Sequence, residues 1–237
     1  MCGTCGCGET LQDRRVRTVE LEQRVLARND ELAERNREWL RERGIVAVNL
    51  MSSPGAGKTT LLERTARTFD DVPLGVVEGD QAMSLDTDRL RALGSRVVQI
   101  NTGTGCHLDA AMLAEALRSL DPVRNSVVFV ENVGNLVCPA LFDLGENARV
   151  VIASVTEGED KPLKYPHMFR AADLVLLNKV DLLPHLGFDV DRFRGTVDRT
   201  RPGVEVLPVS ALSGTGFDRW HDWLRERTPA ASGSPVG

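Results

Sequence analysis

Residues 52–60 (SSPGAGKTT) combine small, flexible positions with a lysine and hydroxyl side chains, directly after a short apolar run. This pattern is typical of a phosphate-binding loop. Glycines allow backbone amides to turn toward phosphates, the lysine reaches the β- and γ-phosphates, and the next hydroxyl binds magnesium. Ser52 replaces the usual first glycine, and a glycine-rich turn without a ligand is the alternative reading. The predicted phosphate-binding residues are Gly55, Ala56, Gly57, Lys58, Thr59 and Thr60.

A second pattern, later in the chain, could recognise a base. Residues 178–181 (NKVD) follow an apolar run and resemble the NKxD motif of GTPases. Guanine presents two adjacent donors, and an ionised aspartate such as Asp181 can accept both. Residues 210–212 (SAL) resemble the loop whose backbone amide donates to the guanine oxygen. We therefore expect GTP rather than ATP, bound by Asn178, Lys179, Asp181, Ser210, Ala211 and Leu212.

A magnesium-dependent GTPase also needs acidic and glycine residues beside the γ-phosphate. Asp80 (in EGDQ) is the candidate magnesium-side carboxylate, with a carboxylate at a helix N-terminus as the alternative. Residues 131–135 (ENVGN) occupy the place of a DxxG motif, but no glutamine follows the glycine. We therefore predict slow intrinsic hydrolysis, completed by a second subunit. The predicted magnesium ligands are Thr59 and Asp80, and the predicted catalytic residues are Lys58, Thr59, Asp80, Glu131 and Gly134.

Three thiols lie within the first seven residues, at Cys2, Cys5 and Cys7. Thiolates are suitable ligands for Zn(II), Cu(I) and square-planar Ni(II). The amino group of Met1 is close enough to complete a planar set of four donors. The sequence thus predicts a metal site on a flexible arm, with an unligated or redox-active tail as the alternative.

A second group of possible metal ligands consists of Cys106, His107 and Cys138. Cys106 and His107 lie at the predicted start of a helix after the third strand, and Cys138 lies seven residues beyond Glu131. Both loops are expected on the nucleotide side of a sheet, so GTP hydrolysis could alter metal affinity there. The alternative is that the cysteines are simply small buried apolar residues.

Alternating apolar runs and helical patterns must position these residues. Runs rich in Val and Ile predict strands at 45–50, 74–77, 96–100, 127–130, 149–155, 174–177 and 204–207. Helices are expected at 58–69, 84–93, 107–120, 163–172, 189–199 and 215–227. Continuous apolar strands separated by helices indicate an α/β fold, with a mostly parallel sheet covered on both faces. Ligands of such sheets bind beyond the carboxyl ends of the strands.

Four segments are predicted from these patterns. Residues 1–8 form the flexible cysteine-rich arm, 44–227 the GTPase domain, and 228–237 a disordered tail. Residues 9–43 lack Gly and Pro and repeat apolar residues at helical spacing, which predicts one long helix or two with a break. Its narrow apolar stripe could pack on its own domain or on a partner chain.

Composition narrows the classes of function. The 237 residues include 29 basic and 34 acidic side chains, giving a net charge of −5, which argues against nucleic acid as a partner. No apolar run reaches the roughly 18 residues of a membrane span, and the start lacks a secretory signal pattern. The five cysteines do not suggest a disulfide scaffold. We therefore expect a cytoplasmic protein.

Taken in order, CxxCGC, SSPGAGKTT, EGDQ, GTGCHLD, ENVGNLVCP, NKVD and SAL resemble the HypB family of hydrogenase nickel-incorporation GTPases. The resemblance covers essentially the whole chain. It implies a SIMIBI-class P-loop GTPase that forms a GTP-linked homodimer and helps deliver nickel to the [NiFe]-hydrogenase large-subunit precursor. It also implies the partners HypA and, in some organisms, SlyD.

The resemblance also assigns the metal sites. Cys2, Cys5 and Cys7 match the high-affinity nickel motif of the family. Cys106, His107 and Cys138 match a second nickel or zinc site near the dimer interface. The chain contains only four histidines, so it lacks the histidine-rich stretch that stores nickel in some members. Delivery is therefore favoured over storage.

Three alternative functions share some of these features: a urease-type accessory GTPase, a cobalamin-related GTPase, and a metal-binding module with a vestigial GTPase. The urease-type relative lacks the cysteine-rich arm, and the cobalamin-related one does not need the second group of metal ligands. The complete nucleotide motifs argue against a vestigial GTPase. Lys161 and Lys164 lie on the expected active-site side and are assigned a nucleotide or dimer contact.

Overall fold

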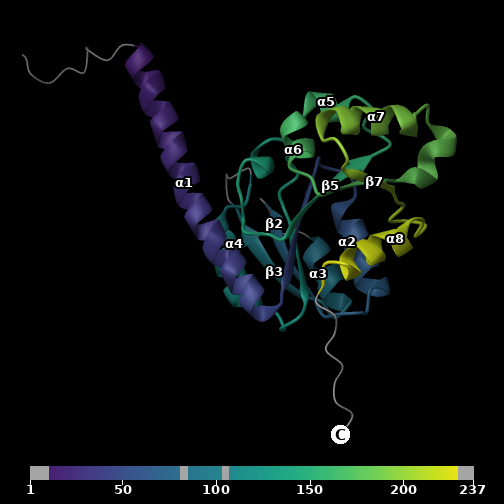
Figure 1. Ribbon diagram of the computed structural model, residues 1–237. Coiled ribbons are helices and arrows are strands. Elements are labelled where there is room, and N and C mark those ends of the chain that lie inside the picture. Colours follow the sequence, from purple (N-terminus) through teal and green to yellow (C-terminus); the bar gives the residue numbers. More distant parts are fainter. Residues whose placement is uncertain (1–10, 81–84, 103–106, 229–237) are drawn as a thin grey trace, which may run out of the picture.

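The computed structural model describes residues 11–80, 85–102 and 107–228, and its centre is a seven-stranded parallel sheet (Figure 1). The spatial order of the strands is β3-β2-β4-β1-β5-β6-β7. Strand β1 pairs with both β4 and β5, and Val48 lies opposite Phe129 on one side and Ala148 on the other. Every predicted strand is present, and the predicted α/β fold class is confirmed. The strands are β1 (Val46–Ser52), β2 (Leu74–Asp80), β3 (Arg96–Asn101), β4 (Val127–Glu131), β5 (Ala148–Ser154), β6 (Leu174–Asn178) and β7 (Glu205–Pro208).

Helices cover both faces of this sheet. They are α1 (Leu11–Arg43), α2 (Lys58–Thr68), α3 (Leu85–Ala92), α4 (Ala110–Leu120), α5 (Lys161–Lys164), α6 (Pro166–Arg170), α7 (Val190–Thr200) and α8 (Phe217–Arg225). Two short 3-10 helices, η1 (Cys138–Ala140) and η2 (Val180–His185), lie in the connecting loops. No described helix is long and apolar enough to cross a membrane.

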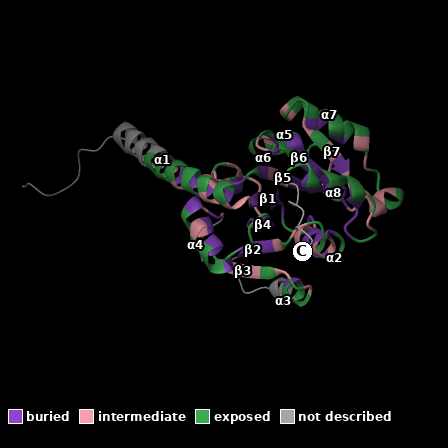
Figure 2. Ribbon diagram, turned by 60° about the horizontal axis from the view of Figure 1, so that its bottom comes forward, coloured by how far each residue is buried: buried purple, intermediate pink, exposed green. Residues whose placement is uncertain are grey.

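Alternating side chains along β1 explain why both faces are apolar. Leu50 packs into a cluster with residues of α2 and α8 on one face. Ala47 packs with α1 and α4 on the other face, and Met51 with α6 and α7. Figure 2 shows this burial along the central strands, while the outer surfaces of the helices are exposed. All residues of β1 are buried, as a central parallel strand requires.

Two helix predictions were wrong in detail. The helix expected at 163–172 is divided into α5 and α6 at Tyr165, because Pro166 has no backbone N–H and begins the second helix. The helix expected from 107 begins only at Ala110, where the carboxylate of Asp109 caps the amide of Met112 at 2.8 Å. His107 therefore lies in the turn before the helix rather than within it.

Helix α1 is a single helix without the break that the sequence left possible. Its first part extends away from the rest of the molecule, and its second part lies along α4 (Figure 1). Leu40 is fully buried there, which contributes roughly 2 kcal/mol of hydrophobic stabilisation. The helix ends at Arg43, whose guanidinium lies over the ring of Trp39. Gly44 follows with a φ of +65°, which is favourable for glycine.

Candidate nucleotide and metal site

The predicted phosphate loop connects the end of β1 to the start of α2. The Nζ atom of Lys58 lies 3.0 Å from the hydroxyl of Ser52, so the serine that replaces the usual glycine contributes a hydrogen bond to the loop. Gly57 precedes α2 with a φ of +99°. A Cβ atom at this position would lie 2.5 Å from Nδ2 of Asn178. The loop therefore requires glycine for both its backbone conformation and its close contact with β6.

Asn178 joins the phosphate loop to the predicted guanine loops. Its Nδ2 donates to the carbonyl of Ala56 at 2.9 Å, and its Oδ1 accepts from the amide of Ala211 at 3.1 Å. The side chain is 1% exposed. Lys179 has a positive φ and donates from Nζ to the carbonyl of Gly55 at 2.7 Å. These contacts hold three separated motifs in one rigid arrangement.

The carboxylate of Asp181 is oriented by Ser210. The serine hydroxyl donates to Oδ1 of the aspartate at 2.5 Å and accepts from the amide of Ser213 at 3.0 Å. A carboxylate fixed by one hydrogen bond retains further acceptor sites for two donors of a base. The structure therefore brings both halves of the predicted base site together. The side chain of Leu212 is 75% exposed, so only the backbone of this residue takes part in the contacts of the loop at 210–212.

The end of β4 lies against the phosphate loop. The hydroxyl of Thr59 donates to Oε1 of Glu131 at 3.0 Å, and the glutamate is 7% exposed. A Cβ atom on Gly134 would lie 3.2 Å from Cγ of Pro54, so this glycine permits a close approach of the loop after β4. The backbone of Asp80 ends β2 beside Asn101, but its side chain lies outside the described part. Three of the predicted catalytic residues, Thr59, Glu131 and Gly134, thus lie at one edge of the sheet.

Of the second predicted metal site, the structure describes His107 and Cys138, and His107 stacks on an aromatic ring. Its imidazole stacks on Phe142 with the ring centroids 3.9 Å apart and an interplanar angle of 27°. Burial lowers the pKa of this histidine, which favours the neutral form that binds metals. Phe142 lies four residues after Cys138, a partly exposed free thiol at the start of η1. The loops that carry His107 and Cys138 therefore meet at this stacked pair.

The remaining predicted ligands, Cys2, Cys5, Cys7 and Cys106, lie outside the described residues. Within residues 11–80, 85–102 and 107–228, no group of three His, Cys, Asp or Glu side chains is arranged to hold a metal ion.

Comparison with known proteins identifies the family. Residues 46–208 match the CobW/HypB/UreG nucleotide-binding domain, which is more than half of the chain. The chain is 55% identical over 215 residues to hydrogenase maturation factor HypB of Escherichia coli K12, covering 90% of this chain and 73% of that protein. The chain belongs to the HypB family of hydrogenase maturation factors. It is therefore a nucleotide-binding protein of a P-loop GTPase family.

Two HypB structures share this fold. The crystal structure from Archaeoglobus fulgidus has a TM-score of 0.79 and 44% sequence identity, and the match covers 85% of this chain and 98% of that one. The crystal structure of HypB from Helicobacter pylori in complex with nickel also has a TM-score of 0.79, with 38% identity, and the match covers 84% and 94% of the two chains. Together with the family match, they confirm the resemblance inferred from the motifs.

Two basic residues support the nucleotide motifs of this HypB-family chain, and sequence reasoning missed the first of them. Arg64 on α2 donates to the carbonyls of Ala211 and Leu212 at 2.6 and 2.5 Å. Lys161 is buried, and its Nζ lies 2.7 Å from both the hydroxyl of Ser53 and a carboxylate oxygen of Glu157. Lys161 therefore contacts the phosphate loop, and its nucleotide or dimer contact stays a prediction.

Lys164, in contrast, is exposed and pairs with Asp160 at 2.7 Å. This ion pair lowers the pKa of the aspartate and raises that of the lysine, mainly through their hydrogen bond. The pair holds the short helix α5 together and leaves Lys164 at the surface.

Asn132 was also missed, although it lies inside a predicted switch motif. Its Oδ1 accepts hydrogen bonds from the amides of Leu108 and Val133 at 3.2 and 3.0 Å. Its Nδ2 lies 3.4 Å from Oδ1 of Asn49 on β1. Leu108 follows His107 directly. Two adjacent residues at the end of β4 thus contact different parts of the site: Glu131 contacts the phosphate loop, and Asn132 contacts the segment beside His107.

Proposed function

We propose that this chain is a GTP-hydrolysing nickel chaperone that delivers Ni(II) during maturation of [NiFe]-hydrogenase. GTP binding promotes its dimerisation, and hydrolysis controls the transfer of the metal. The observation that carries the proposal is the pair at the end of β4. Glu131 accepts from Thr59 in the phosphate loop, while its neighbour Asn132 accepts from Leu108, next to His107.

The base-binding contacts support guanine as the recognised base. Asp181 is an acceptor in a fixed orientation, and the two donors of guanine are adjacent on one edge of the base. Adenine has no such pair of donors at this edge. Asn178 and Arg64 keep the two base loops in place beside the phosphate loop.

The phosphate side supports hydrolysis with bound Mg²⁺. Thr59 and Asp80 are the proposed ligands of the ion, and the carboxylate of Glu131 beside the Thr59 hydroxyl makes this region acidic, as a cation site requires. When bound, the ion neutralises phosphate charge. Lys58 binds the β- and γ-phosphates, and the amide of Gly134 contacts the γ-phosphate. No glutamine follows Gly134 to orient water, so turnover by one subunit is slow and a second subunit completes the site.

Nickel is the cargo, carried first by Cys2, Cys5 and Cys7 and then by Cys106, His107 and Cys138. The second site accepts Zn(II) as well, because thiolate and imidazole ligands suit both ions. A movement at the end of β4 after GTP hydrolysis shifts Asn132 and the segment beside His107 together. The metal then passes to the hydrogenase large-subunit precursor with the help of HypA and, in some organisms, SlyD.

Metal titration tests this proposal. Reduced protein is titrated with Ni(II) and with Zn(II), and the molecular mass is recorded with GTP, with GDP and without nucleotide, always with Mg²⁺. A variant with Cys2→Ala, Cys5→Ala and Cys7→Ala is measured in parallel. The proposal predicts two sites in the unchanged chain, one in the variant, and a dimer with GTP. One site or none, unaffected by nucleotide, would contradict it.

A further inference from the structure

Two buried asparagines on α1, Asn29 and Asn36, connect the helix to the two loops around the metal residues. They lie seven residues apart, on one face of the helix, and are 6% and 5% exposed. A buried primary amide must satisfy both its donors and its acceptor. Here the partners are backbone groups at the start of α4, next to the loop of His107, and in the loop after η1, and we call the two residues the amide clamp.

Asn29 makes one hydrogen bond to each loop. Its Oδ1 accepts from the amide of Ala110 at 2.9 Å, at the first residue of α4. Its Nδ2 donates to the carbonyl of Asp143 at 2.7 Å, in the loop that follows η1. The amide of Asn29 thus fixes the distance between the start of α4 and residue 143.

Asn36 contacts the same two loops from the next turns of the helix. Its Nδ2 donates to the carbonyls of Ala110 and Leu144 at 2.8 and 2.9 Å. The loop lies directly on the helix at this point, because a Cβ atom on Gly145 would lie 2.2 Å from the carbonyl oxygen of Ala33. Gly145 has a φ of +84°, so only glycine readily fits there.

Charged groups strengthen this attachment. Arg37 donates to both carboxylate oxygens of Asp143 at 3.1 and 2.9 Å. Arg37 and the backbone amide of Gly145 lower the pKa of that aspartate against the opposing effect of burial. Glu146 accepts from Arg149 at 2.6 Å and from the amide of Leu144 at 2.8 Å. The loop is therefore held both by α1 and by its own ion pairs.

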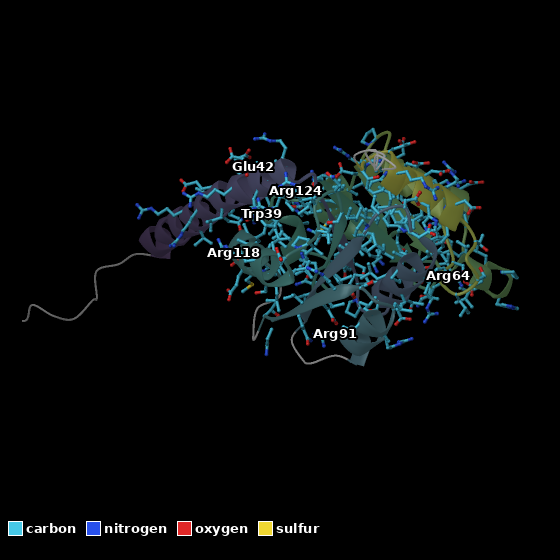
Figure 3. All side chains as sticks on the ribbon, turned by 90° about the horizontal axis from the view of Figure 1, so that it is seen from below. Trp39, Glu42, Arg64, Arg91, Arg118 and Arg124 are labelled. Atoms are coloured by element: carbon cyan, nitrogen blue, oxygen red, sulfur yellow. The ribbon has the colours of Figure 1, made fainter. Side chains whose placement is uncertain are left out.

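The backbone partners of the clamp lie close to the proposed metal ligands along the chain. Ala110 is three residues after His107, and Asp143 is five residues after Cys138. Between these contacts, Phe142 stacks on the imidazole of His107. Figure 3 labels Trp39 and Glu42 near the carboxyl-terminal end of α1, with Arg118 of α4 and Arg124 nearby. A shift of α1 would move both loops, because both are bonded to it.

We propose that the amide clamp sets the position of the loop of His107 relative to the loop of Cys138, which makes Asn29 and Asn36 positioning residues for metal binding in the GTPase domain. This inference rests on the proposed function, because it takes His107 and Cys138 as ligands. Groups that orient metal ligands without touching the metal commonly change its affinity by about 10- to 100-fold. Helix α1 begins four residues after Cys7, so the same helix connects the cysteine-rich segment to this site.

Two aspartate substitutions test the clamp with almost no change in shape. Asn36→Asp replaces the donor by an acceptor opposite the carbonyls of Ala110 and Leu144, and so loses both hydrogen bonds. Asn29→Asp keeps the acceptor for the Ala110 amide but loses the bond to Asp143. Arg35→Gln is the matched control, because it changes the net charge by the same amount at an exposed position of α1.

Each substitution is made in the full chain together with Cys2→Ala, Cys5→Ala and Cys7→Ala, so that only the domain site is measured. Ni(II) and Zn(II) are titrated, the thiolate-to-nickel absorption bands are recorded, and the affinity for GTP with Mg²⁺ is determined. We expect Asn36→Asp to weaken metal binding at least tenfold and to change the absorption bands. Asn29→Asp should have a smaller effect, and Arg35→Gln none. GTP affinity should remain within about twofold in all three.

Metal affinity within twofold of the parent for both aspartate variants would overturn the clamp while leaving the proposed function intact. Equal losses of GTP and metal affinity would also overturn it, because they would indicate general destabilisation. If Asn36→Asp fails to fold, Asn29→Asp alone decides between these results. A parent chain that binds neither metal at the domain site would overturn the proposed function, and the clamp with it.

Discussion

The hydroxyl of Thr59 donates a hydrogen bond to Oε1 of Glu131 at 3.0 Å, although the two residues are 72 positions apart in the sequence. The contact joins the start of α2 to the end of β4 across neighbouring strands. It places an acidic group beside the residue that follows the lysine of the phosphate loop. The proposed nucleotide and magnesium site at Thr59 is therefore in direct contact with the segment that leads through Asn132 toward His107.

The proposed role of Asp181 in base recognition leads to the first prediction. Asp181→Asn replaces one acceptor by a donor and removes the charge, so we expect the binding of guanine nucleotides to weaken by about 10- to 100-fold, or roughly 1.5–3 kcal/mol. Isothermal titration with GDP and with xanthosine diphosphate measures this change. Because xanthine carries a carbonyl in place of the guanine amine, the variant should prefer it. Unchanged guanine binding would show that Asp181 does not contact the base.

Arg64 supports the base loop through two carbonyls, and Arg64→Ala should loosen it. Loss of two hydrogen bonds of roughly 1 kcal/mol each predicts GTP binding weaker by about 3- to 30-fold. Arg67→Ala, at an exposed position on the same helix, is the matched control and should have no effect. Equal affinities for the two variants would mean that the loop keeps its position without Arg64.

Gly57→Ala tests the close contact between the phosphate loop and Asn178. The new Cβ would lie 2.5 Å from Nδ2 of the asparagine, at a backbone φ of +99°. We expect a loss of at least about 1–3 kcal/mol in unfolding free energy from the backbone conformation alone, together with loss of GTP binding. Gly187→Ala is the control, since a Cβ atom there would have nothing within 4 Å. Chemical denaturation and nucleotide titration measure both effects.

The buried His221 leads to a prediction of how the unfolding free energy depends on pH. Its side chain is buried near Phe69 and Phe217, and burial lowers its pKa, with Arg225 adding to the effect. The unfolded chain therefore binds more protons near the ordinary pKa of about 6.5. The unfolding free energy should fall as the pH decreases through this value and below it. Carboxylates whose pKa is lowered in the folded chain, such as Asp143 and Asp160, reduce the unfolding free energy only at more acidic pH.

The substitution His221→Phe should reduce this slope between pH 7 and pH 5, measured by urea denaturation at each pH. A smaller slope should remain, because burial also lowers the pKa of His107. A slope in the variant equal to that of the unchanged chain would show that His221 does not titrate differently in the folded state.

Much of the fold could be predicted because its signals are local. Each strand of a buried parallel sheet is a continuous apolar run, so the strand that became β4 was visible as VVFV. The phosphate loop was visible because its mechanism requires glycine and lysine at fixed spacing. The error at 163–172 arose because helical periodicity extends across Pro166, where the backbone must start a new helix.

The contacts that hold the site together could not be predicted in the same way. Arg64 lies 147 residues from Ala211, and Asn36 lies 108 residues from Leu144. Neither has a local pattern that distinguishes it from other arginines or asparagines on a helix. Their roles follow from the order of strands in the sheet, which places distant loops beside the helices. Asn132 is different, because it lies within the motif ENVGN, which the sequence already marked as a switch. Its side chain can accept a hydrogen bond from the neighbouring loop, and this capacity was the signal that could have identified it.

In the proposed function, nucleotide state and metal affinity are coupled through the end of β4. The most direct test is the Ni(II) affinity of the variant with Cys2→Ala, Cys5→Ala and Cys7→Ala, measured with GDP and with a non-hydrolysable GTP analogue. We predict affinities that differ by at least about fivefold, with nickel changing the affinity for the analogue relative to GDP by the same factor. Equal nickel affinities in the two nucleotide states would contradict this coupling.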